Sequence, residues 1–268
     1  MVYSPPHTMT SIFLFGLLAA GANVVGGLVL VKSGVHRWGE RFLKYLVALG
    51  AGFMLAAIFL EILPESVRIW TRDARGESAS DAVLGAMTLL LLGYLLIQFF
   101  EHTLTPHFHF GAETHPESVM RPSAAYTAAG GLCIHTFFDG VSIASAFYVS
   151  PKVGLLVFIA IFLHKMPEGF TVASIMLASG RSTQKALIAT AVIGAATLAG
   201  VIAVAVLDAR MTDAVAYALP FSAGVTLYVA ASDLIPEVNQ KEERNPTVSI
   251  VVFVGVALFY LLHKVIEG

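Results

Sequence analysis

Eight long apolar runs constrain this chain of 268 residues more than any other feature of its sequence. A helix needs about 20 residues to cross the roughly 30 Å hydrocarbon layer of a bilayer, and each run is that long or nearly so. Only 13% of the residues are charged and the mean hydropathy is +0.78, which lies outside the range of soluble proteins. Continuous apolar blocks also disfavour a β-barrel, whose strands alternate in polarity. The runs are 11–31, 43–64, 82–100, 124–149, 153–178, 186–207, 214–236 and 248–263.

We therefore predict an all-α integral membrane protein of eight transmembrane helices, with a single domain over residues 1–268. Residues 1–10 carry no Lys or Arg and the first run is about twice as long as the apolar core of a signal peptide, so we expect a retained span. Eight spans put both termini on one side. The loops after the first, third, fifth and seventh runs carry more Lys and Arg, which predicts that both termini lie outside.

A histidine-containing connection over 101–123 separates the third and fourth runs and is expected to be cytoplasmic. Three prolines interrupt it, which is typical of a loop rather than a packed element. Several neutral imidazoles can share one first-row metal ion, so the loop is a candidate for metal capture, and the alternative is a plain surface loop. Its histidines are His102, His107, His109 and His115.

A long-range repeat relates the second and seventh runs. Residues 52–55 lead to Glu61 and a following Leu-Pro-Glu, and 172 residues later residues 224–227 lead to Asp233 and a following Ile-Pro-Glu. Five span steps separate the copies, so the two helices cross the membrane in opposite directions. This inverted repeat is typical of many secondary transporters and predicts three spans, a central pair and three inverted spans.

A second repeat lies in the central pair of runs. His135 and Asp139 recur 29 residues later as His164 and Glu168, and a glycine follows each acid. Residues i and i+4 lie on one face of a helix, about 5–6 Å apart, so each run presents one histidine and one acid together. Ionisable groups inside a membrane are costly and mark functional sites. The alternative is two buried pairs that only hold the helices together.

Two imidazoles and two carboxylates form a donor set for a divalent transition metal. This set suits zinc, iron(II), manganese or cobalt, whereas calcium and magnesium favour oxygen ligands alone. Antiparallel neighbours can close both pairs on one ion. We predict a metal site at mid-depth formed by His135, Asp139, His164 and Glu168.

The segments H-T-F-F-D-G at 135–140 and H-K-M-P-E-G at 164–169 resemble the paired signatures of the ZIP (Zrt/Irt-like) metal transporters, and the similarity covers nearly the whole chain. The resemblance implies transport of divalent metals into the cytoplasm, typically zinc and often iron, manganese, cobalt or cadmium. It places the transport site on the four residues named above. It also makes Met54 a candidate weak ligand through its soft thioether, with plain packing as the alternative.

The chain departs from this family where many members hold a second metal. Such members use an Asn or similar residue after the first histidine and an acid or Asn after the second, whereas this chain has Thr136 and Lys165. The Lys165 ammonium can pair with Asp139 or Glu168 at about the position of a second cation. We predict one metal and one tethered positive charge. The alternative is that Lys165 extends away from the site.

Three further residues are candidates for an ion pathway. Glu61 and Asp233 precede the Pro-containing ends of the second and seventh runs, and Ser142 belongs to a stripe of small residues along the central runs. The acids can equally be solvated helix ends, and small residues also serve close helix packing.

The function predicted from these features is transport of a divalent metal, zinc first, as substrate of a multi-pass protein of the cell membrane (the inner membrane if the source is bacterial). The protein is not expected to be an enzyme, because Lys165 stands where an H-E-x-x-H protease has its general base. A sensor or a non-transporting homologue is a further alternative. A net charge of −2 without a basic patch predicts no nucleic-acid partner. The partners are metal ions and lipid, and a homodimer is left open.

Overall fold

The computed structural model describes residues 6–33, 37–73, 78–104, 122–208, 214–239 and 246–267, and these are helical throughout apart from short turns. Eight helical spans are long and apolar enough to cross a membrane, which confirms the all-α class and the number of spans. The α-helices are α1 (Pro6–Ser33), α2 (Arg37–Ala57), α3 (Leu63–Asp73), α4 (Ala79–Leu104), α5 (Pro122–Val149), α6 (Pro151–Ala178), α7 (Thr183–Asp208), α8 (Ala214–Tyr228), α9 (Ile235–Asn239) and α10 (Pro246–Glu267). Two π-helical turns, η1 (Ile58–Ile62) and η2 (Val229–Leu234), interrupt the second and seventh spans.

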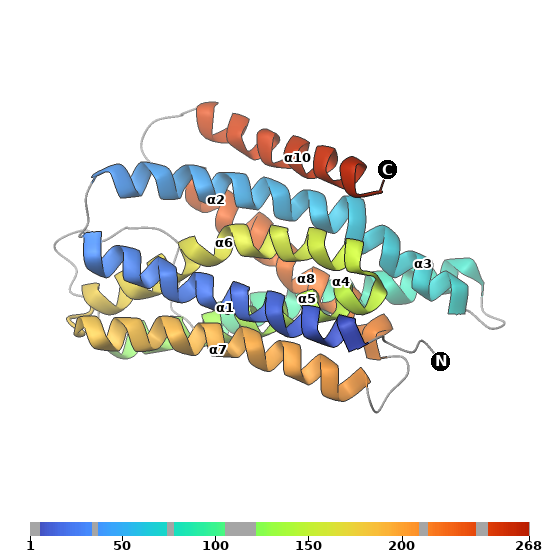
Figure 1. Ribbon diagram of the computed structural model, residues 1–268, viewed down its shortest axis with the longest axis horizontal. Helices are drawn as coiled ribbons and strands as arrows, with labels where there is room; N and C mark the ends of the chain where they lie inside the picture. The colour runs from blue at the N-terminus through green and yellow to red at the C-terminus, as the bar shows by residue number, and fades with distance from the viewer. Residues whose placement is uncertain are drawn as a thin grey trace.

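The long helices run along one common direction, the long axis of the bundle in Figure 1. Helix α1 begins and α10 ends at the same end of the bundle (Figure 1), as an even number of crossings requires. Helices α5 and α6 lie among the others rather than at the edge, and 67% of the residues in their most apolar windows are buried. The two histidine/acid pairs therefore sit in the most protected part of the molecule.

The second span is longer than the sequence predicted. Residues 65–81 were expected to form a connection, but α3 continues the helix to Asp73. The inner face of this extension is held by the Trp70 indole, whose Nε1 donates to the carbonyl of Ala216 over 2.8 Å. On the outer face Glu65 and Arg68 form an ion pair one turn apart. The polar residues on the outer face of α3 end the apolar run, so the prediction stopped before the helix did.

The two π turns occupy matching places in the sequence repeat that relates the second and seventh spans. Glu61 lies in η1 and Asp233 lies in η2, and a proline follows each turn at Pro64 and Pro236. Proline lacks the N–H that would continue the regular ladder, so the backbone changes its winding just before it. π turns inside α-helices frequently occur at functional sites.

Four helix pairs close through reciprocal glycines. In each pair, a Cβ on the glycine of either helix would overlap the backbone of the other helix, so only glycine permits the observed approach. The pairs are α1–α6 (Gly26 with Gly169), α5–α7 (Gly140 with Gly200), α2–α10 (Gly52 with Gly255) and α4–α8 (Gly93 with Gly224). Helix α1 packs on α6 as α7 packs on α5. Helix α2 packs on α10 as α8 packs on α4.

Candidate metal centre

A single residue joins the two helices that carry the histidine/acid pairs. Helix α5 ends at Val149 and α6 begins at Pro151, with Ser150 in extended conformation between them. The Ser150 hydroxyl accepts the N–H of Val153 over 3.2 Å, and Pro151 occupies the first helical position, where its missing N–H costs nothing. So short a turn makes α5 and α6 neighbours that run in opposite directions.

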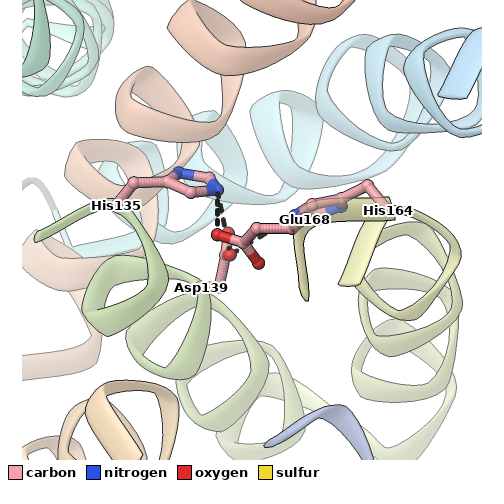
Figure 2. A group of neighbouring side chains, drawn as sticks. All are labelled: His135, Asp139, His164 and Glu168. Carbon is pink, nitrogen blue, oxygen red and sulfur yellow. Dashed lines mark hydrogen bonds and ion pairs between the residues drawn. The ribbon is translucent and has the colours of Figure 1, made fainter. Parts of the chain in front are cut away.

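The four side chains point toward one another between these helices, His135 and Asp139 from α5 and His164 and Glu168 from α6 (Figure 2). One ligand atom from each residue lies within 4.8 Å of all the others. All four are buried, with exposed fractions of 3% or less. Helix α6 remains continuous through Pro167, which lies beside Glu168. The structure therefore brings together the four residues that the sequence proposed as ligands.

Asp139 lies at the centre of the cluster. Its Oδ2 is 3.2 Å from His135 Nε2 and 3.3 Å from His164 Nε2. The two imidazole rings are 5.7 Å apart between centroids and tilted by 43°. Both Nε2 atoms are thus turned to the same carboxylate, which is the arrangement in which one ion could be shared by the two helices.

Lys165 is fully buried and bridges the two carboxylates. Its Nζ lies 2.6 Å from Asp139 Oδ2 and 2.9 Å from Glu168 Oε2. The side chain does not extend away from the site, although Lys165 is on the same helix as Glu168 and only three residues before it. A buried ammonium held by two carboxylates is a charge-compensated arrangement, whereas an unpaired one would be strongly destabilising.

Asn23 of α1 also belongs to the cluster and was missed by the sequence analysis. With its amide nitrogen turned to α6, it donates to Glu168 Oε2 over 3.1 Å and to the carbonyl of Lys165 over 2.6 Å. The approach is possible because Gly169 has no side chain, since a Cβ there would overlap the Asn23 backbone. A lone amide inside the otherwise apolar first run is the signal that could have identified it.

The two remaining candidates near the centre have ordinary local partners. The Thr136 hydroxyl donates to the carbonyl of Cys133 over 3.2 Å, within its own helix. Met54 is fully buried in an apolar cluster that includes Ala160 and Val229. These contacts fit the alternative that Met54 only packs against its neighbours. A role of Met54 as a metal ligand stays a prediction.

The predicted pathway residues have different surroundings. Glu61 is 8% exposed and its Oε2 lies 2.7 Å from Nδ1 of His263 on α10, a partner that the sequence analysis did not anticipate. Asp233 is half-buried in η2, next to Ser232, whose hydroxyl lies 2.9 Å from that of Tyr94. Ser142 is buried one turn beyond Asp139, and its hydroxyl has no hydrogen-bond partner among the described residues.

The predicted metal-capture loop lies mostly outside the described residues. His102 is exposed in the last turn of α4, where its Nδ1 is 3.0 Å from the carbonyl of Gln98. His107, His109 and His115 fall in 105–121, outside the described ranges.

Comparison with known proteins gives matches along nearly the whole chain. The sequence model of the ZIP zinc transporter family matches residues 8–130 and 114–263. Zinc transporter ZIP9-B of Xenopus laevis is 27% identical, and the match covers 86% of each protein. Zinc transporter YKE4 of Saccharomyces cerevisiae is 25% identical over 83% of this chain and 71% of its own length. Human zinc transporter ZIP4 is 30% identical over 150 residues, which are 56% of this chain and 21% of that protein.

Proposed function

We propose that this chain, which belongs to the ZIP zinc transporter family, carries zinc into the cytoplasm through the centre between α5 and α6. Members of this family are multi-pass transporters and not enzymes, and the relatives named above are zinc transporters. The observation that carries the proposal is the set of four buried ligand atoms within 4.8 Å on two facing helices. Divalent metal is therefore the substrate that passes through this site.

The donor set favours zinc among the possible substrates. Four ligands of imidazole and carboxylate type match the tetrahedral geometry that zinc prefers. Iron(II), manganese, cobalt and cadmium are the secondary candidates, because mixed nitrogen and oxygen ligands discriminate poorly among such ions. Competition uptake with these ions, measured side by side, ranks them.

The centre holds one metal ion, with Lys165 in place of a second. Two ionised carboxylates supply two negative charges, and the ammonium of Lys165 already compensates one of them at 2.6 and 2.9 Å. One divalent ion outweighs the remaining charge, so a second ion would enter a centre that is already positive. Repulsion between buried charges is strong because little solvent screens them.

The ion reaches the centre along polar side chains on either side of it. Glu61 and Asp233 stand at the two π turns, and Ser142 and Ser145 have buried hydroxyls without partners among the described residues. Such hydroxyls suit a partly hydrated ion. Met54 adds a weak thioether ligand, and the histidines of the 101–123 connection collect metal at the cytoplasmic side.

The transport cycle uses the inverted repeat. Helix α1 packs on α6 as α7 packs on α5, and α2 packs on α10 as α8 packs on α4, which supports three spans, a central pair and three inverted spans. The excess of Lys and Arg in the loops after the first, third, fifth and seventh spans supports termini outside. The central helices then rock against the outer elements, so that the buried site opens to each side in turn.

Radiolabelled zinc uptake into proteoliposomes tests the proposal. His164→Ala and Glu168→Ala should each abolish uptake, because each removes a buried ligand. Gly130→Ala is the control and should keep uptake near the wild-type rate, since a Cβ at Gly130 meets nothing within 4 Å. Zinc binding without uptake by the wild type would instead indicate a sensor, and hydrolysis of a peptide or lipid would indicate an enzyme.

A further inference from the structure

The two oxygens of Glu168 have different surroundings. Oε2 is 2.9 Å from Lys165 Nζ on its own helix and accepts the Asn23 amide of α1 over 3.1 Å. Oε1 accepts no hydrogen bond from the described residues and faces His135 Nε2 at 3.7 Å. One oxygen is thus held from two sides, and the other is turned to the ligand cluster.

We propose that Asn23 is a positioning residue that holds Glu168 Oε2 and so presents Oε1 alone to the transported ion. This inference rests on the proposed function, and it adds a selectivity determinant that lies outside the two ligand helices. Asn23 can act in this way because it is fully buried and its second hydrogen bond, to the Lys165 carbonyl, fixes the amide plane relative to α6.

Close contacts between α1 and α6 also hold the backbone that carries Asn23. Gly26 lies against the carbonyl of Met166, and Gly169 lies against the carbonyl of Asn23, so the two helices touch on both sides of Glu168. These contacts fix the backbone that carries Asn23, so the amide would have to change its own side-chain conformation to follow a rotation of Glu168. Asn23 therefore resists rotation of the carboxylate, which is the movement that would offer both oxygens to one ion.

The consequence is a preference for a four-coordinate ion. With one oxygen each from Asp139 and Glu168 and one nitrogen from each histidine, the donor set stays at four and suits zinc. If both oxygens were available, the extra ligand would favour ions such as manganese(II), which prefer octahedral, oxygen-rich sites. Partners that orient a ligand typically change metal affinity about 10- to 100-fold when they are removed.

The test compares Asn23→Leu and Asn23→Ala with Thr190→Val in proteoliposomes. Leu keeps the branched side-chain skeleton of Asn, in a larger volume, and removes both N–H donors, whereas Ala removes them and leaves space. Thr190 is an appropriate control because it is fully buried, contacts α1 at Gly27 and lies on α7, outside the cluster. Uptake of zinc and of manganese is measured separately, with KM and maximal rate resolved for each ion, and folding is checked by size-exclusion chromatography.

We expect both Asn23 variants to raise the KM for zinc about tenfold and to shift the manganese-to-zinc uptake ratio in favour of manganese. Thr190→Val should change neither. An unchanged ratio in folded Asn23 variants would overturn the inference, and so would failure of both Asn23 variants to fold while Thr190→Val folds, because Asn23 would then serve packing alone. Absence of metal uptake by the wild type would count against the proposed function itself.

Discussion

Each histidine/acid pair offers one imidazole and one carboxylate, but the residue after the histidine and the partners of the carboxylate differ between the two pairs. On α5 the residue after the histidine is Thr136, whose hydroxyl is turned to its own helix backbone. On α6 the corresponding residue is Lys165, whose ammonium bridges both carboxylates. Glu168 is further held by Asn23 of α1, whereas Asp139 faces both imidazoles. The repeat supplies a symmetric donor set, and the neighbouring residues decide its charge and the orientation of each carboxylate.

The largest expected effect comes from removing the histidine of either pair. His135→Ala and His164→Ala should each reduce zinc affinity by at least about a hundredfold, and by similar amounts, because a four-ligand site loses one of its imidazoles in both cases. Binding is measured by isothermal titration of purified protein in detergent. A loss confined to one of the two variants would show that only one helix holds the ion.

Lys165→Met should remove the positive charge that compensates the carboxylates of Asp139 and Glu168. It leaves two buried carboxylates without their ammonium, and breaking a buried ion pair typically costs about 3–5 kcal/mol. We expect a lower Tm without metal and a larger rise in Tm on zinc addition than in the wild type, because zinc then supplies the missing positive charge. Equal Tm values with and without the substitution would mean that the two ion pairs contribute little.

Glycine substitutions test whether the two histidine/acid pairs depend equally on close packing against a neighbouring helix. Gly140→Ala and Gly169→Ala each place a methyl group on the backbone of a facing helix, at Thr197 and Asn23 respectively. Overpacking of this kind costs about 1–3 kcal/mol, so both should lower the Tm. Only Gly169→Ala should also weaken zinc binding, because it displaces Asn23. Gly130→Ala is the control, since a Cβ there meets nothing within 4 Å.

Thr136→Val is the smallest expected change. The Thr136 hydroxyl bonds within its own helix at 3.2 Å, and such bonds contribute little to helix stability. Zinc affinity should stay within about twofold of the wild type, as for other substitutions of groups that do not touch the ligands. A marked fall in affinity would place the hydroxyl beside the ion and make the two pairs more alike than their surroundings indicate.

The sequence predicted the spans, and the proximity of the four candidate ligand side chains, because both follow from periodicity. Apolar runs of bilayer length identify spans, and the i, i+4 spacing repeated after 29 residues puts His135 with Asp139 and His164 with Glu168 on facing helices. The extension of the second span to Asp73 was missed because amphipathic polar residues imitate a loop.

Contacts between helices that are distant in sequence could not be predicted in the same way. Asn23 lies within the first apolar run and His263 ends the last one. The pairing of Asn23 with Glu168, or of His263 with Glu61, depends on which helices pack together. That packing is set by glycines such as Gly169, whose partners only the folded chain reveals.

The most direct test of the single-metal centre is the number of zinc ions bound per chain, measured by elemental analysis of purified protein with zinc in excess. The wild type should bind one zinc ion at this centre and Lys165→Asp should bind two, because a carboxylate then replaces the tethered ammonium. Every protein compared also carries His102→Ala, His107→Ala, His109→Ala and His115→Ala, which removes zinc held by the histidines of the 101–123 connection. Two ions in the wild type, or one in Lys165→Asp, would contradict the account.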